Sequence, residues 1–161
     1  MAIACLCGFM LIAGLLALFF FANRSFASLT GYLDLDQKTQ IALDKMSREI
    51  RQVHRLTSFS STNLTFEDYD SSTLNYSYDP VARTLSRTRN GSTETLLTGC
   101  DSLQFSEFQR TPNLNTFQPI PTTNTLEAKV IQLSWNCSRA ILGTKANTES
   151  MQSAKVVIRN K

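Results

Sequence analysis

An uncharged apolar run at the start of the chain limits what the protein can fold into. Residues 2–22 contain no charged side chain. About 20 apolar residues in a helix, each rising about 1.5 Å, match the ~30 Å hydrocarbon layer of a bilayer. The sequence therefore predicts a transmembrane segment at residues 1–22.

A cleaved signal peptide is the alternative explanation for this run. Ser25-Phe26-Ala27 offers small residues at a spacing that a signal peptidase accepts. Three features favour a retained anchor instead. No basic residue precedes the run, the run exceeds the usual ~7–15 residues, and Arg24 falls inside the cleavage region.

Residues 23–56 continue the run as an amphipathic helix. Gly31 is the only glycine between residues 15 and 90, and the first proline is Pro80. We therefore expect one rod from Ala2 to Leu56, which the segment TSFSSTN at 57–63 ends. At about 100° per residue, one narrow face of this helix collects residues that we expect to pack on a sheet. They are Tyr32, Leu35, Leu43, Met46, Ile50 and Val53.

Residues 57–161 predict an antiparallel sheet domain. NLTFE at 63–67 and TLNYSY at 73–78 alternate apolar and polar residues and predict a hairpin. Asn90-Gly91 predicts the turn of a second hairpin at 83–97, because both residues tolerate positive φ. Further strands are expected in SLQFSEF, KVIQLSWNC and AKVVIRN. The predicted fold class is α+β, a long helix packed on one small antiparallel sheet.

Two segments of this domain suggest recognition surfaces. Residues 111–125 contain three prolines and exceed the common loop length, so we expect a functional or variable loop there. Arg83, Arg87 and Arg89 alternate along one strand, which indicates either a basic stripe or a sheet edge protected by charge.

The composition gives little support for catalysis or nucleic-acid binding. The net charge is +3, with 16 basic and 13 acidic residues dispersed along the chain, so no basic footprint for nucleic acid is expected. The single histidine, His54, has no orienting partners in the sequence, and no catalytic or phosphate-binding motif occurs. We expect no enzyme activity, cofactor, metal site or small-molecule substrate.

Four cysteines divide into two pairs. Cys5 and Cys7 lie in the apolar run and are expected to behave as small apolar residues. Cys100 and Cys137 lie in the predicted sheet domain, where an exported location would favour a disulfide between them. The alternative is that both are free buried thiols of a cytosolic domain, which the sequence does not distinguish from a disulfide.

The order of these segments resembles type IV pilins and pseudopilins, and the details are similar to the minor pseudopilins of the PulJ and PilW kind. The residues that carry the similarity are those at 43–70 and 78–110 and the ending SAKVVIRN, together with the helix. The resemblance implies a structural subunit of a type II secretion or type IV pilus system. Such a subunit sits in the bacterial inner membrane as a single-pass protein, with its C-terminal domain in the periplasm.

The resemblance also implies the partners. They are the lipid bilayer, other pilin-like subunits and the assembly machinery, with the apolar helices packing together in a short filament or its tip. Small residues allow close helix approach in such packing. The candidates are Ala4, Gly8, Ala13, Gly14 and Ala17.

The start of the chain departs from the family pattern. Residues 8–13 resemble the cleavage and methylation motif, but Ala13 stands where the family has a glutamate. Because residues 1–7 contain no basic residue, we expect Met1 to be an internal start, with the leader upstream. For residues 1–161 alone, the positive-inside rule places the domain in the cytoplasm, because Arg24 and Lys38 follow the span. A basic leader before the span would reverse this predicted orientation. The alternative function is a membrane-anchored extracytoplasmic binding module that uses loop 111–125 and the sheet face.

Overall fold

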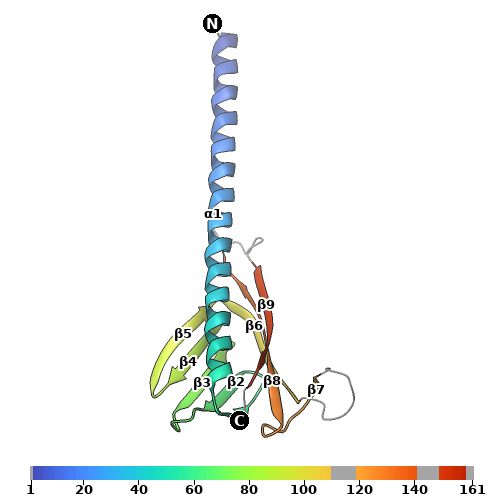
Figure 1. The fold of residues 1–161 in the computed structure, drawn as a ribbon. Helices are drawn as coiled ribbons and strands as arrows, with labels where there is room; N and C mark the ends of the chain where they lie inside the picture. The colour runs from blue at the N-terminus through green and yellow to red at the C-terminus, as the bar shows by residue number, and fades with distance from the viewer. Residues whose placement is uncertain (1, 110–118, 141–148, 159–161) are drawn as a thin grey trace.

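The computed structural model describes residues 2–109, 119–140 and 149–158, which form one long helix and antiparallel strands in an α+β layout (Figure 1). The elements in chain order are α1 (Ala2–Gln52), β1 (Arg55–Phe59), β2 (Asn63–Glu67), β3 (Thr73–Asp79), β4 (Thr84–Arg89), β5 (Ser92–Thr98), β6 (Cys100–Gln109), β7 (Ile120–Pro121), β8 (Ala128–Ser138) and β9 (Glu149–Val157).

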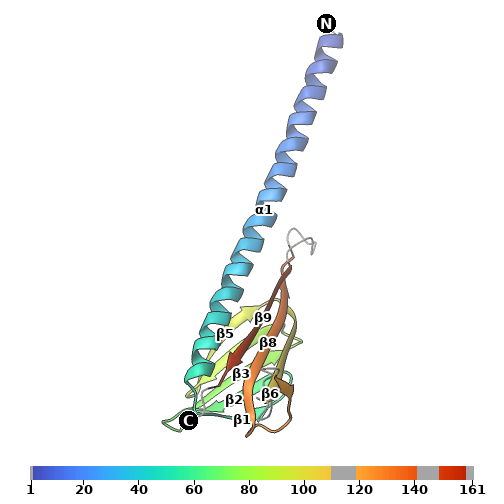
Figure 2. The same cartoon turned by 45° about the vertical axis from the view of Figure 1, so that its right-hand side comes forward.

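Helix α1 has 51 residues without interruption, which corresponds to a rod about 77 Å long. It is long and apolar enough to cross a membrane. Its N-terminal half projects away from the strands, and its C-terminal half lies along them (Figures 1 and 2). Most of its backbone proximity to the strands is to β9 and β5.

The helix ends at Gln52, so the expected end at Leu56 is wrong. The last helical hydrogen bond runs from the Val53 amide to the Glu49 carbonyl, at 3.2 Å. The next amide, that of His54, donates instead to the Glu67 carbonyl of β2, at 3.0 Å. Pairing with β2 thus draws residues 55–59 into strand β1, which the sequence pattern had assigned to the helix end and a turn.

The strands form two sheets, which corrects the expectation of one small sheet. The first sheet has five strands in the order β1-β2-β3-β4-β5, and the second has four in the order β7-β6-β8-β9. All neighbouring strands are antiparallel. Each sheet buries one face, and the apolar residues of both join one core with the buried side of α1.

Both predicted hairpins are present. Strands β2 and β3 pair from Asn63 with Ser77 to Glu67 with Thr73. Strands β4 and β5 are joined at Asn90 and Gly91, whose φ angles are 51° and 79°, as a tight turn of this kind requires.

Strands β6, β8 and β9 include residues from the three further segments predicted as strands. Part of the segment expected as a loop at 111–125 is a strand. Ile120 and Pro121 form the short strand β7, which pairs with Gln109 and Phe108 of β6. Residues 111–118 lie outside the described residues.

Gly99 alone carries the chain from the first sheet to the second, between β5 and β6. Its φ is +74°, which favours glycine, and a Cβ at this position would lie 2.8 Å from the Ser138 carbonyl oxygen. The Ser138 amide donates to the Gly99 carbonyl at 2.9 Å. The two backbones therefore approach too closely for a side chain.

Substitution of Gly99 by alanine is expected to destabilise the fold more than the same change at Gly91. Both residues have positive φ, which costs an alanine about 1 kcal/mol, but only Gly99 adds a backbone clash, since Gly91 has open space around it. Denaturant unfolding in detergent, followed by fluorescence of the single tryptophan, Trp135, measures the difference. Equal losses in Gly99→Ala and Gly91→Ala would contradict the close approach.

Candidate functional site: the long helix and its attachment to the two sheets

The buried side of α1 attaches the helix to the sheets. Of the residues expected on this face, Leu35, Met46, Ile50 and Val53 are buried, and Leu43 is partly buried against the core. Tyr32 is 38% exposed, so its expected place in the packed face is wrong. Tyr32 lies one turn above Leu35, where α1 leaves the sheets.

Two buried positions on this face were missed from the sequence. Thr39 and Ala42 are both buried, and with Leu35 and Met46 they continue the same side of the helix at spacings of three and four. Thr39 was missed because it is polar, and Ala42 because it is small. Their four-residue relation to the expected stripe was the available signal.

Thr39 belongs to a polar contact between α1 and β9. Its Oγ1 donates to the Asp36 carbonyl at 2.8 Å and lies 3.3 Å from Oγ of Ser150, which is itself buried. Oδ1 of Asp36 accepts hydrogen bonds from Ser150 Oγ at 3.3 Å and from Gln152 Nε2 at 3.4 Å. These bonds satisfy polar groups that the packing of α1 removes from water.

Glu49 attaches the helix to the first sheet. Arg87 of β4 donates from Nε to Oε2 at 2.8 Å and from Nη2 to Oε1 at 2.7 Å, and the Tyr76 hydroxyl of β3 donates to Oε2. The side chains of Arg87 and Glu49 are only 14% and 15% exposed. A two-pronged ion pair of this kind combines charge with fixed geometry.

Burial and these bonds act in opposite directions on the pKa of Glu49. Burial raises it, but the hydrogen bonds from Arg87 and Tyr76 outweigh burial, so the net pKa lies below its ordinary value of 4.5. Burial and the neighbouring carboxylate raise the pKa of Tyr76, so the phenol stays protonated and donates. Glu49 is therefore a carboxylate that the fold needs in its charged form.

The remaining ionic contacts of the helix are more exposed. Asp34 accepts from Lys38 at 3.1 Å and from Arg139, which follows β8, and these bonds lower its pKa. Lys45 bonds to Glu94 of β5 at 2.6 Å. Exposed ion pairs contribute little to stability individually. The Lys45–Glu94 and Arg139–Asp34 pairs nevertheless join α1 to β5 of the first sheet and to the segment after β8 of the second.

The expected basic stripe is not free for a partner. Each of its arginines forms an ion pair within the chain: Arg83 with Asp101, Arg87 with Glu49, and Arg89 with Asp68. Strand β4 also lies between β3 and β5, so it is not an edge.

The N-terminal half of α1 presents apolar side chains on all sides. Phe9 to Phe21 contains large apolar residues that are each more than half exposed. Of the small residues expected in helix packing, Gly8 and Gly14 have open space around them, and Ala13 and Ala17 are exposed. The Ala4 side chain lies outside the described residues. At 100° per residue, Ala13 and Ala17 share a side, whereas Gly8 and Gly14 do not lie on it.

Cys100 and Cys137 face each other across β6 and β8. Their Cα atoms are partners in the strand register, and their sulfurs lie 2.7 Å apart, with both side chains buried as free thiols. The sequence alone could not establish this register.

Glu107 of β6 is a buried carboxyl group on the inner face of the second sheet. The residue is 3% exposed, and within the described part of the chain neither of its side-chain oxygens has a hydrogen-bond partner. Burial raises its pKa above the ordinary value of 4.5. The alternating pattern of β6 puts Glu107 on the inner face with Leu103 and Phe105, which was a usable signal in the sequence.

Among the described residues, no group of three or more histidine, cysteine, aspartate or glutamate side chains is placed to hold a metal ion. His54 packs its ring against Tyr69, with ring centroids 4.8 Å apart. No protein-family model matches the sequence, and no significant match is found among curated proteins.

Replacing Glu49 by glutamine is expected to lower the free energy of unfolding by about 3 kcal/mol at pH 7, because Arg87 loses its charged partner in a mostly buried site. The contribution of Glu49 is present above pH 4.5 and is lost as the pH falls through its lowered folded-state pKa. Urea unfolding in detergent across this pH range measures both effects. Asp44→Asn, on an exposed position of the same helix, is the control, and an equal loss there would contradict the assignment.

Replacing Glu107 by glutamine is expected to stabilise the protein. A carboxyl with a raised folded-state pKa destabilises the fold increasingly as the pH rises above 4.5 through that pKa. The variant should therefore gain about 1 kcal/mol at pH 7.5 and little at pH 4. Thermal unfolding at the two pH values, with the exposed Glu127→Gln as control, measures the gain. A loss of stability at pH 7.5 would show that Glu107 has a partner.

Proposed function

We propose that the protein is a pilin-like structural subunit, similar to a minor pseudopilin of a type II secretion or type IV pilus system. Its helix α1 anchors it as a single-pass protein in the bacterial inner membrane, with the sheet domain in the periplasm. Other pilin-like subunits then pack against α1 in a short filament or at its tip. The observation that carries the proposal is that one unbroken apolar helix continues from the membrane-length segment into the packed domain.

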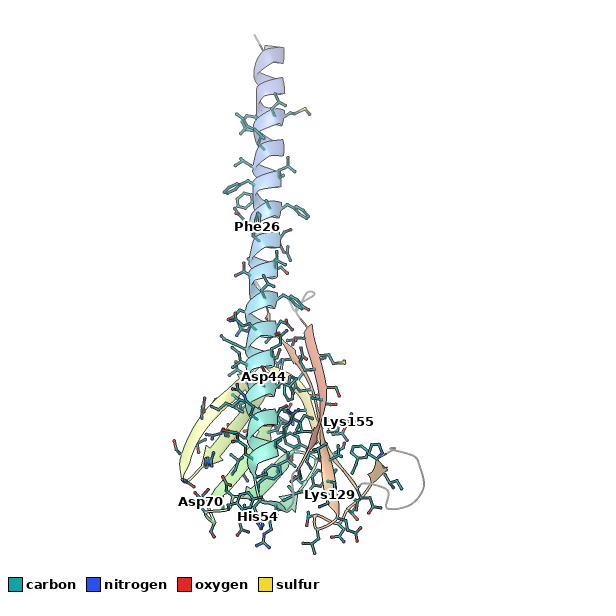
Figure 3. All side chains as sticks on the ribbon, viewed as in Figure 1. Phe26, Asp44, His54, Asp70, Lys129 and Lys155 are labelled. Carbon is teal, nitrogen blue, oxygen red and sulfur yellow. The ribbon has the colours of Figure 1, made fainter. Side chains whose placement is uncertain are left out.

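The length of α1 leaves a segment that neither lipid nor the sheets cover. A span of residues 2–22 fills the hydrocarbon layer, and the buried face of the helix begins at Leu35. Between them, Phe26, Leu29 and Leu33 are 68%, 56% and 57% exposed. Figure 3 shows Phe26 on the projecting part of the helix, above the sheets, and Asp44 alongside them.

These three residues form an outer stripe on the side of the helix that faces away from the sheets. At 100° per residue, Phe26 and Leu33 lie about 160–180° around the helix from Leu35, and Leu29 lies about 120° from it at the border of the stripe. Each buried apolar Å² is worth about 25 cal/mol, so large side chains in water favour a partner that covers them. An apolar helix of a like subunit covers the outer stripe and the membrane segment continuously.

The periplasmic orientation rests on two supports. The resemblance places the domain there, and the facing cysteines Cys100 and Cys137 suit an oxidising compartment. The family has a glutamate near the start of its apolar segment, where this sequence has Ala13. Contact between subunits would therefore depend on the apolar face of α1.

A membrane-anchored binding module is the second candidate. It is favoured by a hollow of about 420 Å³ on the second sheet, which is lined by hydroxyl and amide side chains such as Gln104 and Ser134 and also by apolar ones such as Met151. Such a module would bind a soluble ligand without needing the outer stripe.

A charge in the outer stripe is expected to abolish association. Leu33→Glu should reduce crosslinking of the protein to pilin-like subunits in membranes at least tenfold, because the charge would be buried at a helix contact. Ile41→Glu is the matched control. Ile41 is 57% exposed, as Leu33 is, but it lies about 80° around the helix from Leu33. The readouts are crosslinking with mass spectrometry, membrane fractionation and thermal unfolding.

The two candidates give different outcomes in this experiment. Loss of crosslinks in Leu33→Glu alone, with insertion and stability unchanged, supports the subunit. Equal crosslinking in both variants, or a monomer that binds a soluble ligand equally well in both, contradicts the subunit and favours the module.

A further inference from the structure

The two sulfurs of Cys100 and Cys137 are held in position by the backbone around them. The Cys100 amide donates to the Arg83 carbonyl at 3.0 Å, and its carbonyl accepts from the Tyr78 hydroxyl at 3.0 Å. Because both backbone groups of Cys100 are bonded to Tyr78 of β3 and to Arg83, which precedes β4, the backbone of Cys100 cannot move away from its partner on β8 without breaking these bonds.

A single guanidinium also fixes the residues that follow the two cysteines. Nη2 of Arg83 donates to Asp101 Oδ1 at 2.5 Å, to Ser138 Oγ at 3.2 Å and to the Gly99 carbonyl at 3.1 Å. Ser138 Oγ also donates to Asp101. Asp101 comes directly after Cys100 and Ser138 directly after Cys137, so the same cluster sets the separation of both strands at this point.

We propose that Cys100 and Cys137 form a disulfide bond and that the bond forms before the two sheets close over the sulfurs. The oxidant is a thiol–disulfide oxidoreductase of the exported compartment. One cysteine thiolate attacks the disulfide of the oxidant to give a mixed disulfide, and the second thiolate displaces the oxidant. The chain loses two protons and two electrons, one S–S bond forms, and the oxidant leaves as a dithiol.

The order of events follows from burial. Both cysteines are 0% exposed in the folded domain, and an attack on a protein disulfide needs direct access to the sulfur. The neighbouring thiol and burial raise the pKa of Cys100, and the hydrogen bond with Cys100 lowers that of Cys137, so burial of both sulfurs, and not their ionisation, excludes the oxidant once the chain has folded. The oxidant must therefore meet the cysteines in the unfolded or partly folded chain, and the finished bond is protected from reductants.

The first test uses the full chain, purified in detergent from the membranes of a bacterial host, with Cys5→Ser and Cys7→Ser so that only this pair remains. Non-reduced peptide mapping should find one linked peptide pair, lighter by two hydrogen atoms than the free peptides. A reductant in native buffer should leave maleimide labelling unchanged, whereas a reductant with denaturant should label both cysteines. Labelling of both after denaturation without reductant would overturn the proposal.

A second test addresses the order. The reduced chain is refolded in detergent with oxidised glutathione added either at the start or after folding is complete. The bond should form at least 100-fold more slowly in the second case, and equal rates would overturn the proposed order.

Replacement of both cysteines should lower the unfolding temperature. Relative to the oxidised Cys5→Ser, Cys7→Ser protein, adding Cys100→Ser and Cys137→Ser should lower Tm by roughly 10 °C. An unchanged Tm would show that no bond is lost. The source of the oxidant rests on the periplasmic orientation in the proposed function, but the two proposals fail separately, because an oxidised protein can still fail to associate and a reduced one can still associate.

Discussion

The packing of the C-terminal half of α1 on both sheets is the contact on which the rest of the structure depends. A helix of 51 residues cannot bury its own surface, and helices in proteins gain most of their stability from packing an apolar face on other elements. Leu35, Met46 and Ile50 supply that face, and they join the apolar residues of both sheets in one core. Without the helix, the part of this shared core that these residues cover would be exposed to water.

Polar groups decide how this packing is oriented. Apolar contacts are not directional, so a smooth stripe would allow the helix to slide or rotate. Glu49 fixes its lower end to the first sheet through Arg87 and Tyr76, and Asp36 fixes a higher turn to β9 of the second. Contacts to different sheets at two positions along the helix give the projecting half of α1 one direction relative to the domain.

The connection between the sheets is the second structural constraint. Gly99 carries the chain across with no room for a side chain, and Arg83, Asp101 and Ser138 bond around it. Cys100 and Cys137 lie at the same place in the register. Backbone approach, charge and sulfur chemistry thus act together where the chain passes from the five-stranded sheet to the four-stranded one.

Local pattern was enough to predict the long helix, the hairpins and most strands, because hydrophobic period and turn residues act over a few neighbouring positions. The Asn90-Gly91 turn is the clearest case, since its positive φ angles depend only on those two residues. Four of the six residues expected on the packed face are buried, but Tyr32 is not, because the sheets end one turn below it.

Only the tertiary structure decided where the helix stops, how many sheets form and which charges are used. Helix α1 ends at Gln52 because the His54 amide donates to the Glu67 carbonyl of β2. This contact forms only when β1 pairs with β2. The arginines of the predicted stripe likewise find carboxylates on other elements. The sequence by itself determined an apolar rod followed by antiparallel strands, since period and turn chemistry are local. Partners, register and burial depend on the whole chain, because they exist only once distant segments meet.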